Sequence, residues 1–228
     1  MKVVILAGGY GTRLSEYVKT IPKPMVKIKN KPLIYYIMKN YAKYGYKEFY
    51  IALGYKGHVL KKYFNKNSFG WNIKLIDTGL KTMTGGRLKR LSKHLKNETF
   101  LMTYGDGVAN INVKKLVNFH KNNKKEFTLT AVRPPARFGV VKIKKNLATY
   151  FKEKSKVDEG WINGGFFVIE PSFLNKIKND KTFLEKEPLE IVCRNKNLAA
   201  YKHLGYWQCV DTKRDLEKLK LNLKKINR

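Results

Sequence analysis

A glycine-rich loop near the start of the sequence has the composition of a phosphate-binding loop. This loop, Leu6-Ala-Gly-Gly-Tyr-Gly-Thr-Arg-Leu14, directly follows an apolar run. Its glycines let backbone N–H groups approach an anion closely, and cations are supplied by Arg13 and by Lys23 in the following Pro-Lys-Pro segment. A structural turn would explain Gly8 and Gly9 alone, but the whole pattern G-G-x-G-T-R followed by P-K-P is more specific. The two features together predict a phosphate site.

Known phosphate loops differ from this one. The P-loop signature G-K-[ST] is absent, and Leu14 stands where a dinucleotide-binding fingerprint has its third glycine. No acidic residue lies near position 30 to hold a ribose. The loop therefore indicates a phosphate-handling protein outside these two classes.

Aspartates directly follow two strand-like segments, although acids are scarce in this chain. Asp106 follows the apolar run at 99–103, and Asp211 follows the run that ends at Val210. Ligands of open α/β sheets bind beyond the carboxyl ends of the strands, and carboxylates are ligands that hold Mg²⁺ on a phosphate. Each aspartate alone would be explained by a turn or cap, especially Asp211 before Thr212 and a terminal helix. As a pair, they favour Mg²⁺-assisted phosphoryl or nucleotidyl transfer.

A substrate patch is predicted in the second half of the chain. Lys154, which ends the segment Phe-Lys-Glu-Lys, could neutralise a phosphate, and Glu153 could accept hydrogen bonds from sugar hydroxyls. Asn163-Gly-Gly165 lies inside a strand-like run, where glycine weakens a strand unless a ligand or backbone must come close. In so lysine-rich a chain, Lys154 taken alone is better explained as a surface lysine.

The elements that would position these residues alternate between strands and helices. A helix is expected from an N-cap at Asn30, with Pro32 as its first residue, to Gly45. The other expected strands and helices of this half are strands at 2–6, 48–53, 73–76 and 99–103, and helices at 57–64 and 86–95. Such alternation indicates βαβ units. The predicted fold class is α/β, a Rossmann-like, mainly parallel mixed sheet flanked by helices.

After Phe127 the strands come closer together, which predicts antiparallel or mixed pairing beside the parallel core. The expected segments are strands at 127–132, 139–143, 148–153 and 161–170, helices at 171–178 and 183–195, a strand pair within 199–210 and a charged helix over 212–228. No linker or internal repeat divides the chain. We therefore expect a single domain over 1–228.

Composition excludes several classes of protein. With 228 residues and 43% hydrophobic content, the chain can bury a sizeable core, and no apolar run approaches the roughly 20 residues that span a bilayer. The N-terminal apolar stretch is too short for a secretory signal, so we expect a cytoplasmic protein without a membrane partner. Two cysteines, Cys193 and Cys209, and four scattered histidines disfavour zinc sites and structural disulfides.

The formal net charge of +31 is typical of proteins that bind nucleic acid. Only 8 of the 48 basic residues are arginine, however, and the lysines are spread from end to end. Base readout and bidentate phosphate contacts favour arginine. We therefore interpret the lysines as solvated surface that attracts anionic substrates, and expect no nucleic acid.

Taken in order, these motifs resemble the sugar-phosphate nucleotidyltransferases through nearly the whole chain. The segment T-G-x-x-x-M-T-G-G-R-L-K-R at 78–90 is the most discriminating, and it is similar to the cytidylyltransferase branch rather than the uridylyl or thymidylyl branches. The other matching segments are LAGGYGTRL (6–14), PKPMV (22–26), KPL (31–33), GYKGHV (54–59), TYGDGVA (103–109), RFG (137–139), INGGFFV (162–168), EPL (187–189) and GYWQCVDT (205–212).

The resemblance implies roles for some of the matched residues and for Glu153 and Lys154. It implies nucleotide contacts by Leu6, Gly8, Gly9, Gly11, Thr12, Arg13, Lys23, Thr84, Gly85 and Tyr104, with the last three near the base and ribose. It implies sugar-phosphate contacts by Glu153, Lys154, Asn163 and Gly164. Arg13 and Lys23 would neutralise the triphosphate, Asp106 and Asp211 would hold Mg²⁺, and Arg13, Lys23 and Asp106 would be catalytic.

The implied reaction transfers the cytidylyl group of CTP to α-D-glucose 1-phosphate and gives CDP-glucose and pyrophosphate. Because the attacking phosphate is already an anion, the reaction needs positioning and electrostatics, which agrees with the lack of a His or Ser constellation. The alternatives are UTP or dTTP, another phosphorylated acceptor, a silent sugar-nucleotide sensor and a nucleic-acid-binding protein. A homo-oligomer is expected, and the short stretch between Phe64 and Asp77 leaves its form and the base selectivity open.

Overall fold

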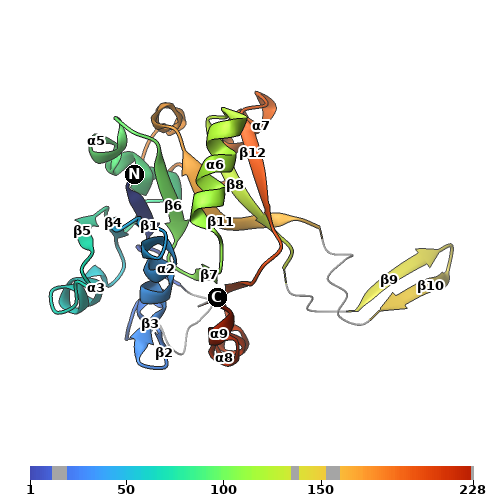
Figure 1. The fold of residues 1–228 in the computed structure, drawn as a ribbon. Coiled ribbons are helices and arrows are strands. Elements are labelled where there is room, and N and C mark those ends of the chain that lie inside the picture. The colour runs from blue at the N-terminus through green and yellow to red at the C-terminus, as the bar shows by residue number, and fades with distance from the viewer. Residues whose placement is uncertain (12–19, 135–138, 153–159, 227–228) are drawn as a thin grey trace.

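A central sheet organises the fold (Figure 1). The computed structural model describes residues 1–11, 20–134, 139–152 and 160–226. Among them, seven strands pair in the order β12 (Leu198–His203), β8 (Phe127–Val132), β11 (Ile162–Ile169), β6 (Phe100–Tyr104), β1 (Val3–Leu6), β4 (Glu48–Leu53), β5 (Asn72–Asp77). Strands β6, β1, β4 and β5 run parallel, whereas β11 is antiparallel to both of its neighbours. The predicted α/β class and its mixed second half are confirmed.

Alternating side chains of β1 supply two cores, one on each face of the sheet. Val3 and Ile5 belong to one core, and Val4 and Leu6 to the other. Helices that cover the first face are α2 (Leu33–Ala42), α3 (Gly57–Phe64), α6 (Val113–Asn123), α8 (Lys213–Leu221) and α9 (Leu223–Ile226). The second face is covered by α4 (Thr84–Arg90), α5 (Ser92–Leu95), the 3₁₀ helix η3 (Pro171–Lys176) and α7 (Glu187–Arg194). Burial on both faces explains the nearly continuous apolar runs of the parallel strands.

The start of α2 differs from the prediction. Strands β2 (Lys27–Ile28) and β3 (Lys31–Pro32) form a short hairpin, so Asn30 lies in a turn and Pro32 is the N-cap rather than the first helical residue. The N–H of Leu33 donates to the carbonyl of Val26. The prediction that Asn30 caps the helix was wrong because Asn30 lies in the turn of this hairpin.

Several other helix boundaries differ from the prediction, and one helix was missed. The helix expected at 86–95 begins at Thr84 and is divided at Leu91, and the segment at 171–178 is a 3₁₀ helix that ends at Lys176. The helix expected at 183–195 is shorter, as α7. Helix α6 was not predicted, although Val113, Leu116 and Val117 have helical spacing.

A short two-stranded ribbon lies beside the main sheet. The segments expected as a strand pair within 199–210 form two strands, β12 and β13 (Trp207–Cys209), that do not pair with each other. Strand β12 joins β8, whereas β13 pairs antiparallel with β7 (Gly107–Ala109), which almost directly follows β6. This ribbon connects the end of β6 to the C-terminal part of the chain.

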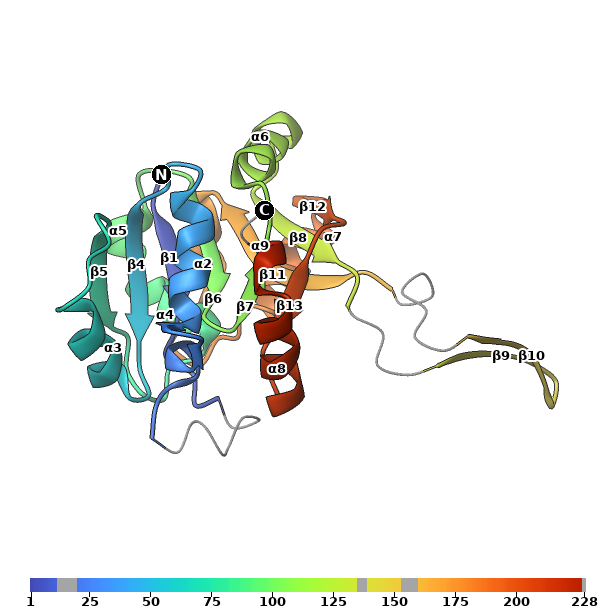
Figure 2. The same ribbon diagram turned by 60° about the horizontal axis from the view of Figure 1, so that its bottom comes forward.

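A separate hairpin, β9 (Val140–Lys144) with β10 (Leu147–Lys152), extends away from the sheet (Figure 2). Its side chains Ile143, Leu147 and Phe151 are exposed. Among the described residues, no helix combines the length and the apolar character that crossing a membrane requires.

Candidate active site

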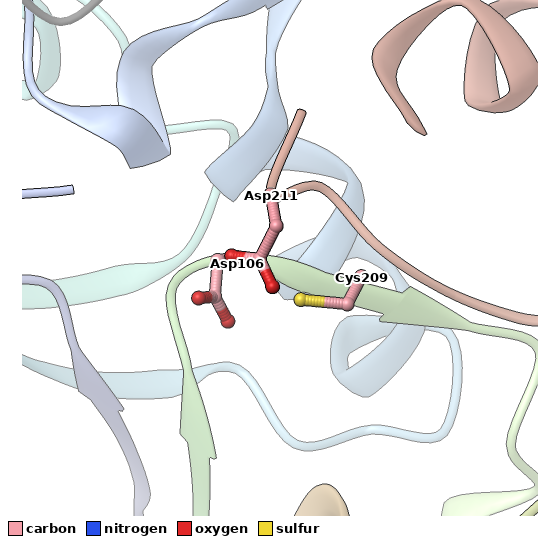
Figure 3. Close-up of side chains that lie close together, drawn as sticks. All are labelled: Asp106, Cys209 and Asp211. Atoms are coloured by element: carbon pink, nitrogen blue, oxygen red, sulfur yellow. The ribbon is translucent and has the colours of Figure 1, made fainter. Parts of the chain in front are cut away.

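The aspartates 106 and 211 converge because of the β7–β13 ribbon. Asp106 precedes β7, Asp211 follows β13, and the N–H of Val210 donates to the carbonyl of Asp106. One donor atom from each of Asp106, Cys209 and Asp211 lies within 4.8 Å of the others (Figure 3). The prediction that the two carboxylates meet is correct, although Asp211 follows a ribbon strand rather than a strand of the main sheet.

Cys209 was not predicted to lie in this cluster. It precedes Asp211 by two residues at the end of an extended segment, a spacing that places side chains on one side of a strand. Burial raises the pKa of the Cys209 thiol, and the charge of Asp106 raises it further. The thiol is therefore neutral at pH 7.

Lys23 connects the two carboxylates. It opens the 3₁₀ helix η2 (Lys23–Met25), and its side chain is largely buried. The ammonium Nζ lies 2.9 Å from Oδ2 of Asp106 and 2.6 Å from Oδ1 of Asp211. Burial by itself lowers the pKa of Lys23, but the carboxylates outweigh it, and the pKa is raised above its ordinary value. Lys23, predicted to face the triphosphate, neutralises the carboxylate pair in this geometry.

The capping explanation for Asp211 is wrong. Helix α8 is capped by Thr212, whose hydroxyl accepts a hydrogen bond from the N–H of Asp215, while the Asp215 carboxylate accepts one from the N–H of Thr212. The side chain of Asp211 contacts Lys23 instead.

The glycine loop lines a cavity of about 280 Å³. Among its lining residues are the predicted nucleotide contacts Leu6, Gly8, Gly9, Gly11, Lys23, Thr84 and Tyr104, together with Asp106. Gly11 has a φ of 66°, a conformation that favours glycine. Thr12 and Arg13 lie outside the described residues. Gly85 packs against the carbonyl oxygen of Thr182 and does not line this cavity.

A larger cavity of about 700 Å³ adjoins the first at Tyr104 and Asp106. It is lined by the predicted sugar-phosphate residues Asn163 and Gly164, and by Glu185, Trp207 and Asp211. The indole N–H of Trp207 donates to the carbonyl of Gly164 over 2.8 Å. Glu153 and Lys154 lie outside the described residues.

Gly165 of β11 makes room for the ring of Tyr104, which lines both cavities. Gly165 has a φ of 78°, and a Cβ atom there would lie 2.7 Å from the ring of Tyr104. The side chain of Asn163 accepts a hydrogen bond from the Gly165 N–H and stabilises this irregular backbone. The close approach that the glycines predicted is made by Tyr104 itself.

Glu185 joins two predicted nucleotide residues and was missed. The hydroxyls of Tyr104 and Thr84 both donate to its carboxylate, and the N–H of Leu184 donates to Thr84. Burial raises the pKa of Tyr104, and the charge of Glu185 raises it further. Tyr104 therefore stays a neutral hydrogen-bond donor. In the sequence, Glu185 lies in a charged run that resembles ordinary surface.

The arrangement suits the joining of two anionic molecules. The carboxylate oxygens of Asp106 and Asp211 are hard ligands that fit a divalent cation. Asp106 lines both cavities, and Asp211 lines the larger one. The thiol of Cys209 is a poorer ligand for such an ion. Two cavities, a glycine loop and a carboxylate pair are the parts that transfer between two phosphates requires.

Comparisons with known proteins agree with this chemistry. Residues 2–225 match the family model described as "Nucleotidyl transferase", and the chain belongs to this family.

Within the family, the chain is 47% identical to the glucose-1-phosphate cytidylyltransferase of Salmonella typhimurium, with 94% of this chain and 93% of that protein covered. It is 33% identical to a mannose-1-phosphate guanyltransferase of Saccharomyces cerevisiae, covering 94% of this chain and 62% of that protein. The crystal structure of HddC from Yersinia pseudotuberculosis complexed with GMP-PN matches with a TM-score of 0.77 and 25% identity, covering 97% of this chain and 99% of that one.

Proposed function

We propose that this protein is a glucose-1-phosphate cytidylyltransferase, which converts CTP and α-D-glucose 1-phosphate into CDP-glucose and pyrophosphate. The observation that carries the proposal is the meeting of a glycine-loop cavity and a larger cavity at Asp106, beside the carboxylate of Asp211. The 47% identity to a cytidylyltransferase over 94% of the chain supports the choice of substrates.

The nucleotide is proposed to bind along the glycine loop, and the sugar phosphate in the larger cavity. A phosphate oxygen of the sugar phosphate attacks the α-phosphorus of CTP, the bond to the β-phosphate breaks, and pyrophosphate leaves. No covalent intermediate with the protein forms. Loop N–H groups and Lys23 offset the charge of the triphosphate, and Asn163 and Gly164 place the sugar phosphate. Arg13, Thr12, Glu153 and Lys154 retain the roles that the resemblance implies.

Mg²⁺ is the proposed cofactor, and Asp106 and Asp211 would hold it. When bound, the ion offsets charge on the phosphate oxygens. The carboxylates already face the cation Lys23, so the site is built for positive charge. Of the two aspartates, Asp106 lines both cavities and thus lies nearest to where the substrates meet.

The choice of base is the finer part of the proposal. A guanyltransferase relative in yeast and a structure complexed with GMP-PN indicate that other members handle guanine nucleotides. A matrix of CTP, UTP, dTTP and GTP against several sugar 1-phosphates, read by pyrophosphate release, tests it. We expect CTP with glucose 1-phosphate to give the highest kcat/KM. Equal turnover of UTP or dTTP would refute cytidylyl specificity.

A homo-oligomer and a cytoplasmic location belong to the same proposal. Cytoplasm is where a consumer of nucleoside triphosphates finds its substrate. Light scattering coupled to gel filtration measures the assembly directly, and a monomer at micromolar concentration would contradict the expected oligomer.

A further inference from the structure

Arg87 is a buried cation in the wall of the glycine-loop cavity, within the segment T-G-x-x-x-M-T-G-G-R-L-K-R at 78–90. It lies on α4, is 4% exposed and lines the cavity. Within the described part of the chain, no carboxylate forms an ion pair with its guanidinium. The group instead donates to neutral oxygens: the carbonyls of Gly8, Leu53, Gly79 and Leu80, and the hydroxyl of Thr78.

These contacts fix one peptide group of the glycine loop. The carbonyl of Gly8 accepts a hydrogen bond from Nη2 of Arg87 over 2.9 Å and another from the N–H of Tyr55 over 3.1 Å. A trans peptide is planar, with its N–H opposite its carbonyl. The N–H of Gly9 is therefore held on the side away from Arg87, where Gly9 is exposed and lines the cavity.

Glycines around Arg87 are required by the guanidinium itself. A Cβ atom on Gly8 would overlap Nη1 of Arg87, and one on Gly54 would lie 2.5 Å from the same nitrogen. The glycine at position 8 thus serves the internal cation, whereas a Cβ on Gly9 would meet no atom within 4 Å. The two adjacent glycines have different tasks.

The charge of Arg87 has a further consequence. Burial lowers the pKa of the guanidinium, yet arginine stays protonated at neutral pH. Neutral oxygens satisfy its hydrogen bonds, and of the charged groups near it the carboxylate of Asp77 favours the protonated form whereas Arg90 opposes it. An anion bound in the cavity that Arg87 lines would add a countercharge beside the guanidinium.

We propose that Arg87 is a positioning residue for the nucleotide: it aims the Gly9 N–H at a phosphate of the nucleoside triphosphate and attracts that phosphate with its charge. This inference rests on the proposed function. Because Arg87 acts on the glycine loop, its effect falls on the nucleotide and leaves the sugar phosphate unaffected.

Replacing Arg87 by lysine tests the inference, because it keeps the charge and loses the planar fork. We expect KM for CTP to rise about tenfold or more, with KM for glucose 1-phosphate changed less than twofold. Arg90→Lys is the matched control, because Arg90 lies on the same helix and pairs with the exposed Asp180. Calorimetric titration with CTP gives the same comparison without turnover.

A second variant covers the case in which Arg87→Lys fails to fold. Thr78→Val keeps the volume and removes an acceptor 2.8 Å from Nη1. It should raise KM for CTP about two- to fivefold, again without an effect on the sugar phosphate. Equal rises in both KM values, or an unchanged KM for CTP in folded variants, would overturn the inference. Wild-type protein that binds no nucleoside triphosphate would instead refute the proposed function.

Discussion

Two buried cations lie beside the same cavity and are held in opposite ways. Lys23 forms ion pairs with Asp106 and Asp211, whereas Arg87 is held by neutral oxygens. The charge of Lys23 is offset by the two carboxylates, whose oxygens are also suitable ligands for a divalent cation. A cation among carbonyls keeps its charge for a ligand and fixes the backbone that carries those carbonyls. One centre is thus suited to binding metal, and the other to shaping the loop.

Removing a carboxylate should have the largest effect on activity. Asp106→Asn or Asp211→Asn keeps the shape and removes a charge, so kcat should fall about 100-fold or more while thermal melting changes little. The double variant should be hardly worse than either single variant, because both residues serve one ion. Glu217→Gln, which removes an exposed carboxylate of α8, is the control. A fully active Asp106→Asn protein would overturn the mechanism.

Removing Lys23 should separate its two roles. In Lys23→Gln, kcat/KM should fall about 10- to 100-fold, because the triphosphate loses a counter-charge. The remaining carboxylates should then bind a divalent cation more tightly, so that added Mg²⁺ raises Tm more in this variant than in the wild type. Lys27→Gln, an exposed lysine of β2, should match the wild type in both measurements. An equal Mg²⁺ response in Lys23→Gln would show that Lys23 does not compete for this site.

Sequence alone identified the residues that follow strands and missed those that depend on long-range contacts. Asp106 and Asp211 were found because each follows a strand-like apolar run, and ligands of open α/β sheets bind beyond the carboxyl ends of strands, although the strand before Asp211 belongs to the antiparallel ribbon. Arg87 and Glu185 were missed because their contacts lie 79 residues away at Gly8 and 81 residues away at Tyr104, and no local pattern encodes such contacts. The fold class followed from alternating apolar runs, whereas the pairing of β13 with β7 did not, since both strands are only three residues long.

Loss of the Glu185 charge should have a moderate effect. Glu185→Gln retains an acceptor for Tyr104 or Thr84 but weakens both hydrogen bonds, each worth about 1–2 kcal/mol. We expect kcat/KM to fall about 3- to 10-fold. Glu187→Gln, two residues further along and bonded to the exposed Lys178, is the matched control. A loss of activity in both variants would point to the local charge rather than to the two hydroxyls.

The exposed pair Arg90–Asp180 should have the smallest effect. Hydrogen bonds from Arg90 lower the pKa of the Asp180 carboxyl, so its contribution to stability is present above the ordinary pKa of Asp and is lost as pH falls through the lowered value. At pH 7, Asp180→Asn should lower Tm by no more than about 2 °C, because exposed ion pairs contribute little. Melting curves between pH 7 and pH 3 should converge for the two proteins. A difference in Tm between the two proteins that grows as the pH falls would contradict this prediction.

The central claim is that the site where the two cavities meet joins a sugar phosphate to the α-phosphate of CTP. An isotope experiment tests this claim most directly. Glucose 1-phosphate labelled with ¹⁸O in its non-bridging phosphate oxygens is incubated with CTP, Mg²⁺ and the purified protein. The masses of CDP-glucose and pyrophosphate are then measured by mass spectrometry. The account predicts that all the label appears in CDP-glucose and none in pyrophosphate, and that Asp211→Asn forms almost no product. Labelled pyrophosphate, or equal product from Asp211→Asn, would contradict it.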